Sequence, residues 1–181
     1  AAHIEVGWGD CILVGGVESM SRIQRRGFNW SPSPELENKF PDAYVGMGKT
    51  AENVAKAWNQ TRLQHEEFAL SSHKKAASAQ SKGLLVNEIA KIQSDDGIIS
   101  EDGCIRGDTN LESMAKLNPA FGDDGVVTAA TSSPLTDGAV FMIVCSEDFA
   151  EKNRLNPIAR IVAGAVTGCA PDMMGIGPIK A

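Results

Sequence analysis

The 181-residue chain has few of the residues that commonly form metal sites, disulfides and catalytic centres. Only 6% of its residues are aromatic, and it has four cysteines and three histidines. No two cysteines are spaced as a CxxC pair and no metal-ligand spacing occurs, so we predict no metal. No apolar run approaches the roughly 20 residues of a membrane span, and no signal peptide is recognisable. We therefore predict a reduced, cytoplasmic protein without a membrane span.

Positive charge is also scarce. The chain has 17 Lys and Arg against 23 Asp and Glu, which gives a net charge of -6. Neutralising nucleic-acid phosphates needs a basic surface, so no nucleic-acid partner is predicted. An anionic ligand would need local positive groups. The length allows one domain or two small ones, and a chain of this size buries roughly 70% of its unfolded surface.

A nucleophile paired with a base is missing as well. Cys11 and Cys145 lie in apolar runs typical of strands, so both are predicted to be buried, unreactive thiols. His65 and His73 lie on a polar helical segment and are predicted to be surface residues. No Ser-His-Asp or Cys-His set follows from the spacing. The acidic pair at 66–67 is predicted to be solvated.

The apolar pattern predicts strands that alternate with helices. Strands are expected at 11–14, ending in a turn at 15–16, and at 126–129, 139–145 and 157–166. The nearly continuous apolar run at 139–145 is typical of a strand buried on both faces. This alternation predicts an α/β layer structure, and the polar helical stretch between 22 and 124 resembles an insertion between two parts of its core.

Helix boundaries follow from capping signals. Thr50 is predicted to be the N-cap of a helix that reaches residue 58. Thr61 and Gln64 form a capping-box pattern at the start of a helix that should stop at Gly83. A second capping box is predicted at 109 and 112, and Ser146 should cap a short helix.

The segment 128–138, with the sequence TAATSSPLTDG, is the most unusual of the chain. Its small residues would let a ligand approach the backbone, and its hydroxyls could donate hydrogen bonds. The same residues would equally suit a capped turn between a strand and a helix. The residues alone leave both interpretations open, and they lead only to an α/β domain with a helical insertion.

Six segments together resemble the thiolase family of acyl-CoA acyltransferases. They occur in the family's order and cover essentially the whole chain: GGVESMS at 15–21, MGKTAENV at 47–54, the helix at 62–76, LESMAKLNPAF at 111–121, TAATSSPLTDG at 128–138 and MGIGP at 174–178. The resemblance implies part of the layered αβαβα thiolase fold. Residues 1–21 and 125–181 would belong to the N-terminal core domain, and 22–124 would form the inserted loop domain that binds coenzyme A.

The resemblance also implies an activity. Thiolases form or cleave 3-ketoacyl-CoA through a cysteine acyl-enzyme, with coenzyme A and acyl-CoA as substrates and no cofactor. The family's catalytic Cys and His segments would lie outside residues 1–181, so no catalytic residue is predicted and the chain alone should be inactive. The parent would be a homodimer or homotetramer, in mitochondria or peroxisomes if eukaryotic. The alternative is a non-catalytic coenzyme A-binding or dimerisation module.

Twelve residues are candidate coenzyme A contacts by this resemblance. Arg106 would lie at the nucleotide end, a helix would line the groove, the 128–138 loop would touch the pantetheine, and two methionines would flank the acyl end. The groove-lining residues are Ser113, Met114, Leu117, Ala120 and Phe121. The loop residues are Ala129, Ser132, Ser133 and Leu135, and the two methionines are Met47 and Met174. Core positions for Met114 and Phe121, and a surface charge without a ligand for Arg106, remain the alternatives. Ala130 replaces a glycine usual in the family, and Pro134 removes a backbone donor.

Overall fold

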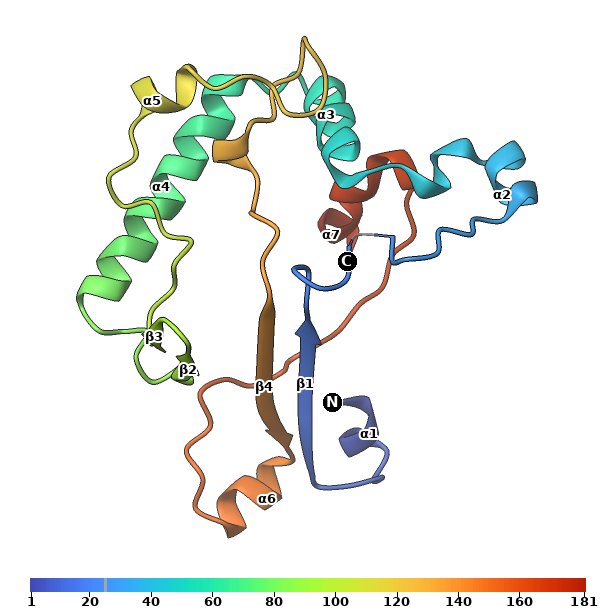
Figure 1. The fold of residues 1–181 in the computed structure, drawn as a ribbon. Coiled ribbons are helices and arrows are strands. Elements are labelled where there is room, and N and C mark those ends of the chain that lie inside the picture. Colours follow the sequence, from blue (N-terminus) through green and yellow to red (C-terminus); the bar gives the residue numbers. More distant parts are fainter. Residues whose placement is uncertain (25) are drawn as a thin grey trace. The chain divides into compact units, whose positions relative to one another are not determined.

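The computed structural model describes residues 1–24 and 26–181 (Figure 1). Helices and short sheets alternate along it, which confirms the predicted α/β class. The chain forms two compact units. Unit 1 comprises Ala1–Ser33, Leu135–Gly168 and Pro178–Ala181, and unit 2 comprises Pro34–Pro134 and Cys169–Gly177. The division into core and loop domains made from the sequence stays a prediction.

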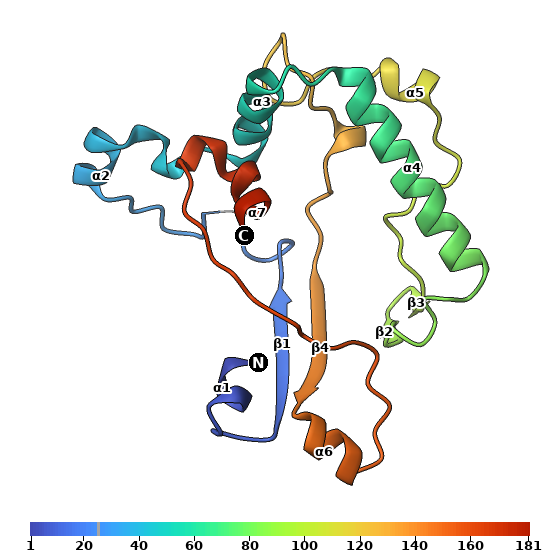
Figure 2. The ribbon, with the colours of Figure 1, turned by 180° about the vertical axis from the view of Figure 1, so that it is seen from behind.

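Unit 1 is built on an antiparallel pair of strands. β1 (Cys11–Glu18) and β4 (Gly138–Cys145) lie side by side in both views (Figures 1 and 2), with Cys11 opposite Cys145 and Glu18 opposite Gly138. The short helices α1 (Ala2–Glu5) and α6 (Glu147–Lys152) flank the pair in sequence, and α7 (Gly177–Lys180) ends the chain. Ser146 caps α6 as predicted, because its hydroxyl accepts a hydrogen bond from the N–H of Phe149.

The turn predicted at 15–16 is absent from unit 1, and β1 continues through both glycines. Gly15 lies opposite Phe141 on β4. A Cβ atom at Gly15 would lie 2.1 Å from the Phe141 ring. The glycine therefore serves the strand pair by making room for the aromatic side chain of the neighbouring strand.

The predicted burial of this sheet is also wrong for the described residues. Cys11 is exposed and Cys145 half-buried, and Phe141 and Ile143 on β4 are about two-thirds exposed. Burial on both faces requires a layer on each side, and the sheet of unit 1 has only β1 and β4 among the residues the structure describes. The predicted strand at 157–166 has no regular structure and is largely exposed.

Asp137, just before β4, holds the end of β1. Its carboxylate accepts hydrogen bonds from the Ser21 hydroxyl at 2.5 Å and the Ser21 N–H at 2.8 Å, with the Ser19 hydroxyl at 3.5 Å. These donors, the Ser21 hydroxyl foremost, hold the pKa of Asp137 below the usual aspartate value of 3.8.

This pKa shift predicts a pH-dependent stability. Because the folded pKa is depressed, the stabilisation is present above pH 3.8 and lost as the pH falls through the folded pKa. We expect Asp137→Asn to unfold at lower urea concentration than the unaltered chain at pH 7, and the difference to disappear on acidification. The effect should be small, since the carboxylate is solvent-exposed. Ser21→Ala should weaken the same pH dependence, and a difference that persists at acid pH would contradict the assignment.

Unit 2 is mainly helical. It contains α2 (Pro34–Lys39), η1 (Pro41–Tyr44), α3 (Met47–Ala57), α4 (Arg62–Ser81), β2 (Ile92–Ser94), β3 (Gly97–Ile99), α5 (Leu111–Ala115), η2 (Ala129–Thr131) and η3 (Pro171–Ile176). The capping box of Thr61 and Gln64 is confirmed at the start of α4. The helix ends two residues before Gly83, whose φ of +69° suits glycine. α4 packs against α5 and η2, and α3 packs against η3.

Two predicted caps in unit 2 are wrong. α3 begins at Met47, so Thr50 lies inside the helix, where its buried hydroxyl donates to the carbonyl of Met47 at 2.7 Å. The cap of α5 is Asn110, paired with Ser113, one residue after the predicted position. Asparagine ranks above threonine as an N-cap, which accounts for the shift.

The strand predicted at 126–129 is reduced to one bridge between Pro119 and Thr128, followed by η2. The prediction that the acidic pair at 66–67 is solvated is wrong for Glu66. This side chain is buried and paired with Arg62, with Nε and Oε1 2.7 Å apart. None of the described helices is both long and apolar enough to cross a membrane.

Candidate functional site

A cavity of unit 2 lies between α3, α4, the η2 loop and η3. Its volume is about 740 Å³, and its walls include the candidate residues Met47, Ser132 and Met174. α4 contributes Phe68, 79% exposed, and the imidazoles of two histidines. The cavity thus combines flexible apolar side chains with a few hydroxyl and imidazole groups, as small-molecule sites do.

Polar side chains of α3 hold the segments that surround this cavity. The carboxylate of Glu52 accepts hydrogen bonds from the N–H groups of Val126 and Val127, at 3.0 and 2.9 Å. The amide of Asn53 donates to the carbonyl of Asp172 at 3.1 Å. Both the loop that contains Ser132 and the segment that contains Met174 are therefore attached to one helix.

The candidate helix α5 is attached to α4 by Arg62. One guanidinium nitrogen of Arg62 donates to the carbonyls of Met114, Ala115 and Leu117 at 2.8, 3.2 and 2.7 Å. Met114 and Ala115 lie in the last turn of α5, where carbonyls lack the regular helical donor four residues on, and Leu117 follows the helix. Met114 is 1% exposed, so its side chain belongs to the core of unit 2, as the alternative interpretation had it.

Ala120 and Phe121 lie against the start of the small-residue loop. The Ala120 N–H donates to the carbonyl of Val127 at 2.9 Å. The Phe121 ring packs so closely on α3 that a Cβ atom at Gly48 would lie 2.3 Å from it. Phe121 remains 43% exposed, so one side of the ring is accessible. The structure therefore places Phe121 against α3 and Ala120 beside Val127, which precedes the loop.

The remaining candidates lie at other positions. The Arg106 N–H donates to Nδ1 of His73 at 3.1 Å, and its exposed guanidinium donates to the Gly103 carbonyl. Ser113 is used in the capping box of α5, and its N–H donates to Asn110. Leu117, Ala129 and Ser133 are exposed. Leu135 belongs to unit 1, whereas the other eleven candidates belong to unit 2.

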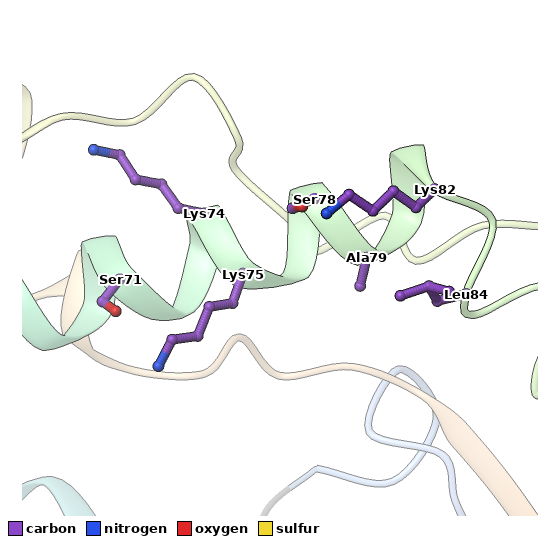
Figure 3. A pocket seen from close by; sticks show the side chains of 7 residues that line it. All are labelled: Ser71, Lys74, Lys75, Ser78, Ala79, Lys82 and Leu84. Carbon is purple, nitrogen blue, oxygen red and sulfur yellow. The ribbon is translucent and has the colours of Figure 1, made fainter.

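A second cavity, of about 400 Å³, lies along the C-terminal half of α4. Three lysines, two serines and two apolar side chains line it (Figure 3): Lys74, Lys75, Lys82, Ser71, Ser78, Ala79 and Leu84. None of the twelve candidates lines this cavity. Three of the twelve candidates line the first cavity, whereas none lines the second.

Catalytic chemistry has few candidates in the described part of the chain. No cysteine there is hydrogen-bonded to a histidine, and the Cys169 thiol donates to the Met174 carbonyl at 3.9 Å. No group of three His, Cys, Asp or Glu residues that could hold a metal occurs among residues 1–24 and 26–181. The contacts made by Arg62, Glu52, Asn53 and His73 were missed from the sequence. Glu52 and Asn53 belong to the MGKTAENV segment, whose resemblance to the family could have marked both as candidates.

Comparisons with known proteins identify the family. The family model described as "Thiolase, N-terminal domain" matches residues 1–148. The chain therefore belongs to the thiolase family, which confirms the resemblance read from the six segments. A 3-ketoacyl-CoA thiolase of Marinobacter nauticus is 43% identical over 188 residues, which cover 100% of this chain and 48% of the relative. An acetyl-CoA acetyltransferase of Rhizobium meliloti is 39% identical, over 99% of this chain and 49% of the relative.

Solved thiolase structures share the fold. The dimeric peroxisomal thiolase of Saccharomyces cerevisiae matches with a TM-score of 0.87 and 32% identity, over 98% of this chain and 47% of the yeast chain. Human mitochondrial 3-ketoacyl-CoA thiolase in complex with CoA matches with a TM-score of 0.82 and 34% identity, over 99% and 49%. The chain spans about half the length of the curated relatives it matches.

Proposed function

We propose that this chain is the coenzyme A-binding part of a thiolase that forms or cleaves 3-ketoacyl-CoA. The acyl group would pass between a cysteine and the thiol of coenzyme A, and that cysteine would come from another part of the parent protein. The parent would work as a homodimer or homotetramer and would need no cofactor. The chain by itself would not turn over substrate.

The main support is the cavity of unit 2. Three of the twelve candidates line it, and Phe121 packs against α3. The helix α3 also holds both the small-residue loop and the Met174 segment. The human relative matched above was solved with CoA, and the dimeric state of the yeast relative supports the proposed oligomer. A coenzyme A-binding module without activity is the second candidate function, favoured by the lack of a cysteine–histidine contact among the described residues.

The proposed inactivity of the chain can be tested directly. We expect the purified 181-residue chain to release no acetyl-CoA from acetoacetyl-CoA and coenzyme A above the blank. The physical reason is that none of the described cysteines has a hydrogen-bonded base to generate a thiolate. Turnover that survives repurification, and that disappears on alkylation of one cysteine, would contradict the proposal and identify a nucleophile within the chain.

Arg106 is proposed to face the phosphates of coenzyme A. An acidic chain must supply positive charge locally to hold an anion. Because the guanidinium is exposed, its contact should contribute on the order of 1 kcal/mol. We expect Arg106→Ala in the parent enzyme to raise the KM for coenzyme A about several-fold, with kcat nearly unchanged. The control Arg154→Ala, which removes an arginine of unit 1, should leave the KM for coenzyme A unchanged. An equal rise in KM for both variants would contradict a specific contact between Arg106 and coenzyme A.

A further inference from the structure

Helix α3 makes the same kind of contact with two separate segments of unit 2. Within the MGKTAENV segment, Glu52 binds the chain 74 and 75 residues further on, at Val126 and Val127. Asn53, the next residue, binds Asp172, 119 residues further on. Each bond joins a side chain to a backbone group, so it fixes the position of the backbone there. It does not depend on which side chain the partner residue has.

The Glu52 contact is tight and specific. One carboxylate accepts from two consecutive N–H groups, at 3.0 and 2.9 Å, and all these groups are partly buried. A Cβ atom at Gly125 would lie 2.5 Å from Oε1 of Glu52. A side chain at 125 would therefore force the Glu52 carboxylate to move away from its present position. A charged acceptor with two N–H donors makes stronger bonds than a neutral one.

From this contact a series of hydrogen bonds leads into the small-residue loop. The carbonyl of Val127 accepts from the Ala120 N–H at 2.9 Å. Thr128 follows, fully buried, and its carbonyl accepts from the Ser132 hydroxyl at 2.9 Å. Ser132 itself lines the cavity. The position of the loop backbone at 128–133 thus depends on where Glu52 holds residues 126 and 127.

We propose that Glu52 and Asn53 are positioning residues for substrate binding. Glu52 holds the loop at 128–133 against α3, and Asn53 holds the segment that carries Met174, so that the two walls of the cavity keep a fixed separation. Neither side chain needs to touch the ligand. The inference rests on the proposed function, because coenzyme A is the ligand expected between these walls.

The test compares Glu52→Gln and Gly125→Ala in the intact parent enzyme. Glutamine keeps the size of the side chain but offers one acceptor and one donor in place of two acceptors, so one of the two N–H groups loses its partner. Alanine at 125 would displace the unaltered carboxylate. We expect either change to raise the KM for coenzyme A about ten-fold and to leave kcat much less affected. The KM of the double variant should be no higher than that of either single variant, because both changes disrupt the same contact.

Hydrogen exchange gives a readout that does not depend on coenzyme A. The amides at 126–132 should exchange faster in both variants, and Glu52→Asp, which keeps the charge, should recover part of the protection. Glu35→Gln, a loss of an exposed carboxylate paired with Lys39 on α2, is the matched control and should change neither readout. Unchanged exchange at 126–132 in Glu52→Gln would overturn the positioning role.

Faster exchange with an unchanged KM, in an enzyme whose KM does respond to Ser133→Trp, would overturn the link to substrate binding. If Ser133→Trp also leaves the KM unchanged, the coenzyme A groove of the proposed function fails instead. The two failures are therefore distinguishable.

Discussion

Replacing Arg62 by methionine is expected to lower the free energy of unfolding of the chain by about 3 to 5 kcal/mol. The change removes the partner of Glu66, a carboxylate only 3% exposed, and leaves its charge buried and unpaired. It also removes the donor to three carbonyls at the end of α5. Methionine fills a similar space, so the loss should come from the missing polar contacts.

Urea unfolding of the chain measures this effect, and two further variants separate its causes. Lys116→Met removes an ion pair of the same i,i+4 geometry, but both partners are largely exposed, so it should cost about 0.5 kcal/mol or less. Arg62→Met combined with Glu66→Leu should recover a large part of the lost stability, because no buried charge remains. Equal costs for Arg62→Met and Lys116→Met would show that the buried pair has no special role.

The features predicted correctly from the sequence depend on residues close together in the chain. Thr61 and Gln64 are three residues apart, and Ser146 is three residues from the N–H that it caps. Such bonds can be recognised from spacing alone. The cap at 109 failed for a similar local reason, since two good capping residues follow one another and the pattern did not decide between them.

The failures in the sheet have a different origin. The apolar run of β4 is typical of a strand covered on both faces, and the thiolase family has a layered fold that would cover it. Exposure depends on what packs against the strand, which the strand's own sequence cannot specify. The same holds for 157–166, whose apolar residues have no partner strand among the described residues.

In the candidate site, the family resemblance named the residues, whereas the structure located the contacts that hold them. Met47, Ser132 and Met174 share one cavity although they are far apart in sequence. Arg62 reaches carbonyls 52 to 55 residues away, and Glu52 reaches N–H groups 74 and 75 residues away. No periodic pattern predicts such pairs, because a side chain that binds backbone places no demand on the identity of its partner.

Replacing Ser133 by tryptophan in the parent enzyme is expected to lower kcat/KM for coenzyme A by about 100-fold. Ser133 is exposed, directly after the cavity-lining Ser132, in the loop proposed to contact the pantetheine. An indole there would occupy the space that the pantetheine needs. Overpacking of this kind costs about 1 to 3 kcal/mol, which corresponds to about 5- to 150-fold in affinity. The loss should appear mainly in the KM, since the chemical groups lie elsewhere.

Two control variants make the result specific to the loop. Ser133→Ala removes only the hydroxyl and should change kcat/KM by a small factor, which separates lost hydrogen bonding from blocked space. Ser81→Trp places the same indole at an exposed position at the end of α4, away from the first cavity, and should leave the kinetics unchanged. If Ser133→Trp behaved like Ser81→Trp, the 128–138 loop would not line the coenzyme A groove. The assignments of Ala129, Ser132 and Leu135 as pantetheine contacts would then also be wrong, because they rest on the same segment as that of Ser133.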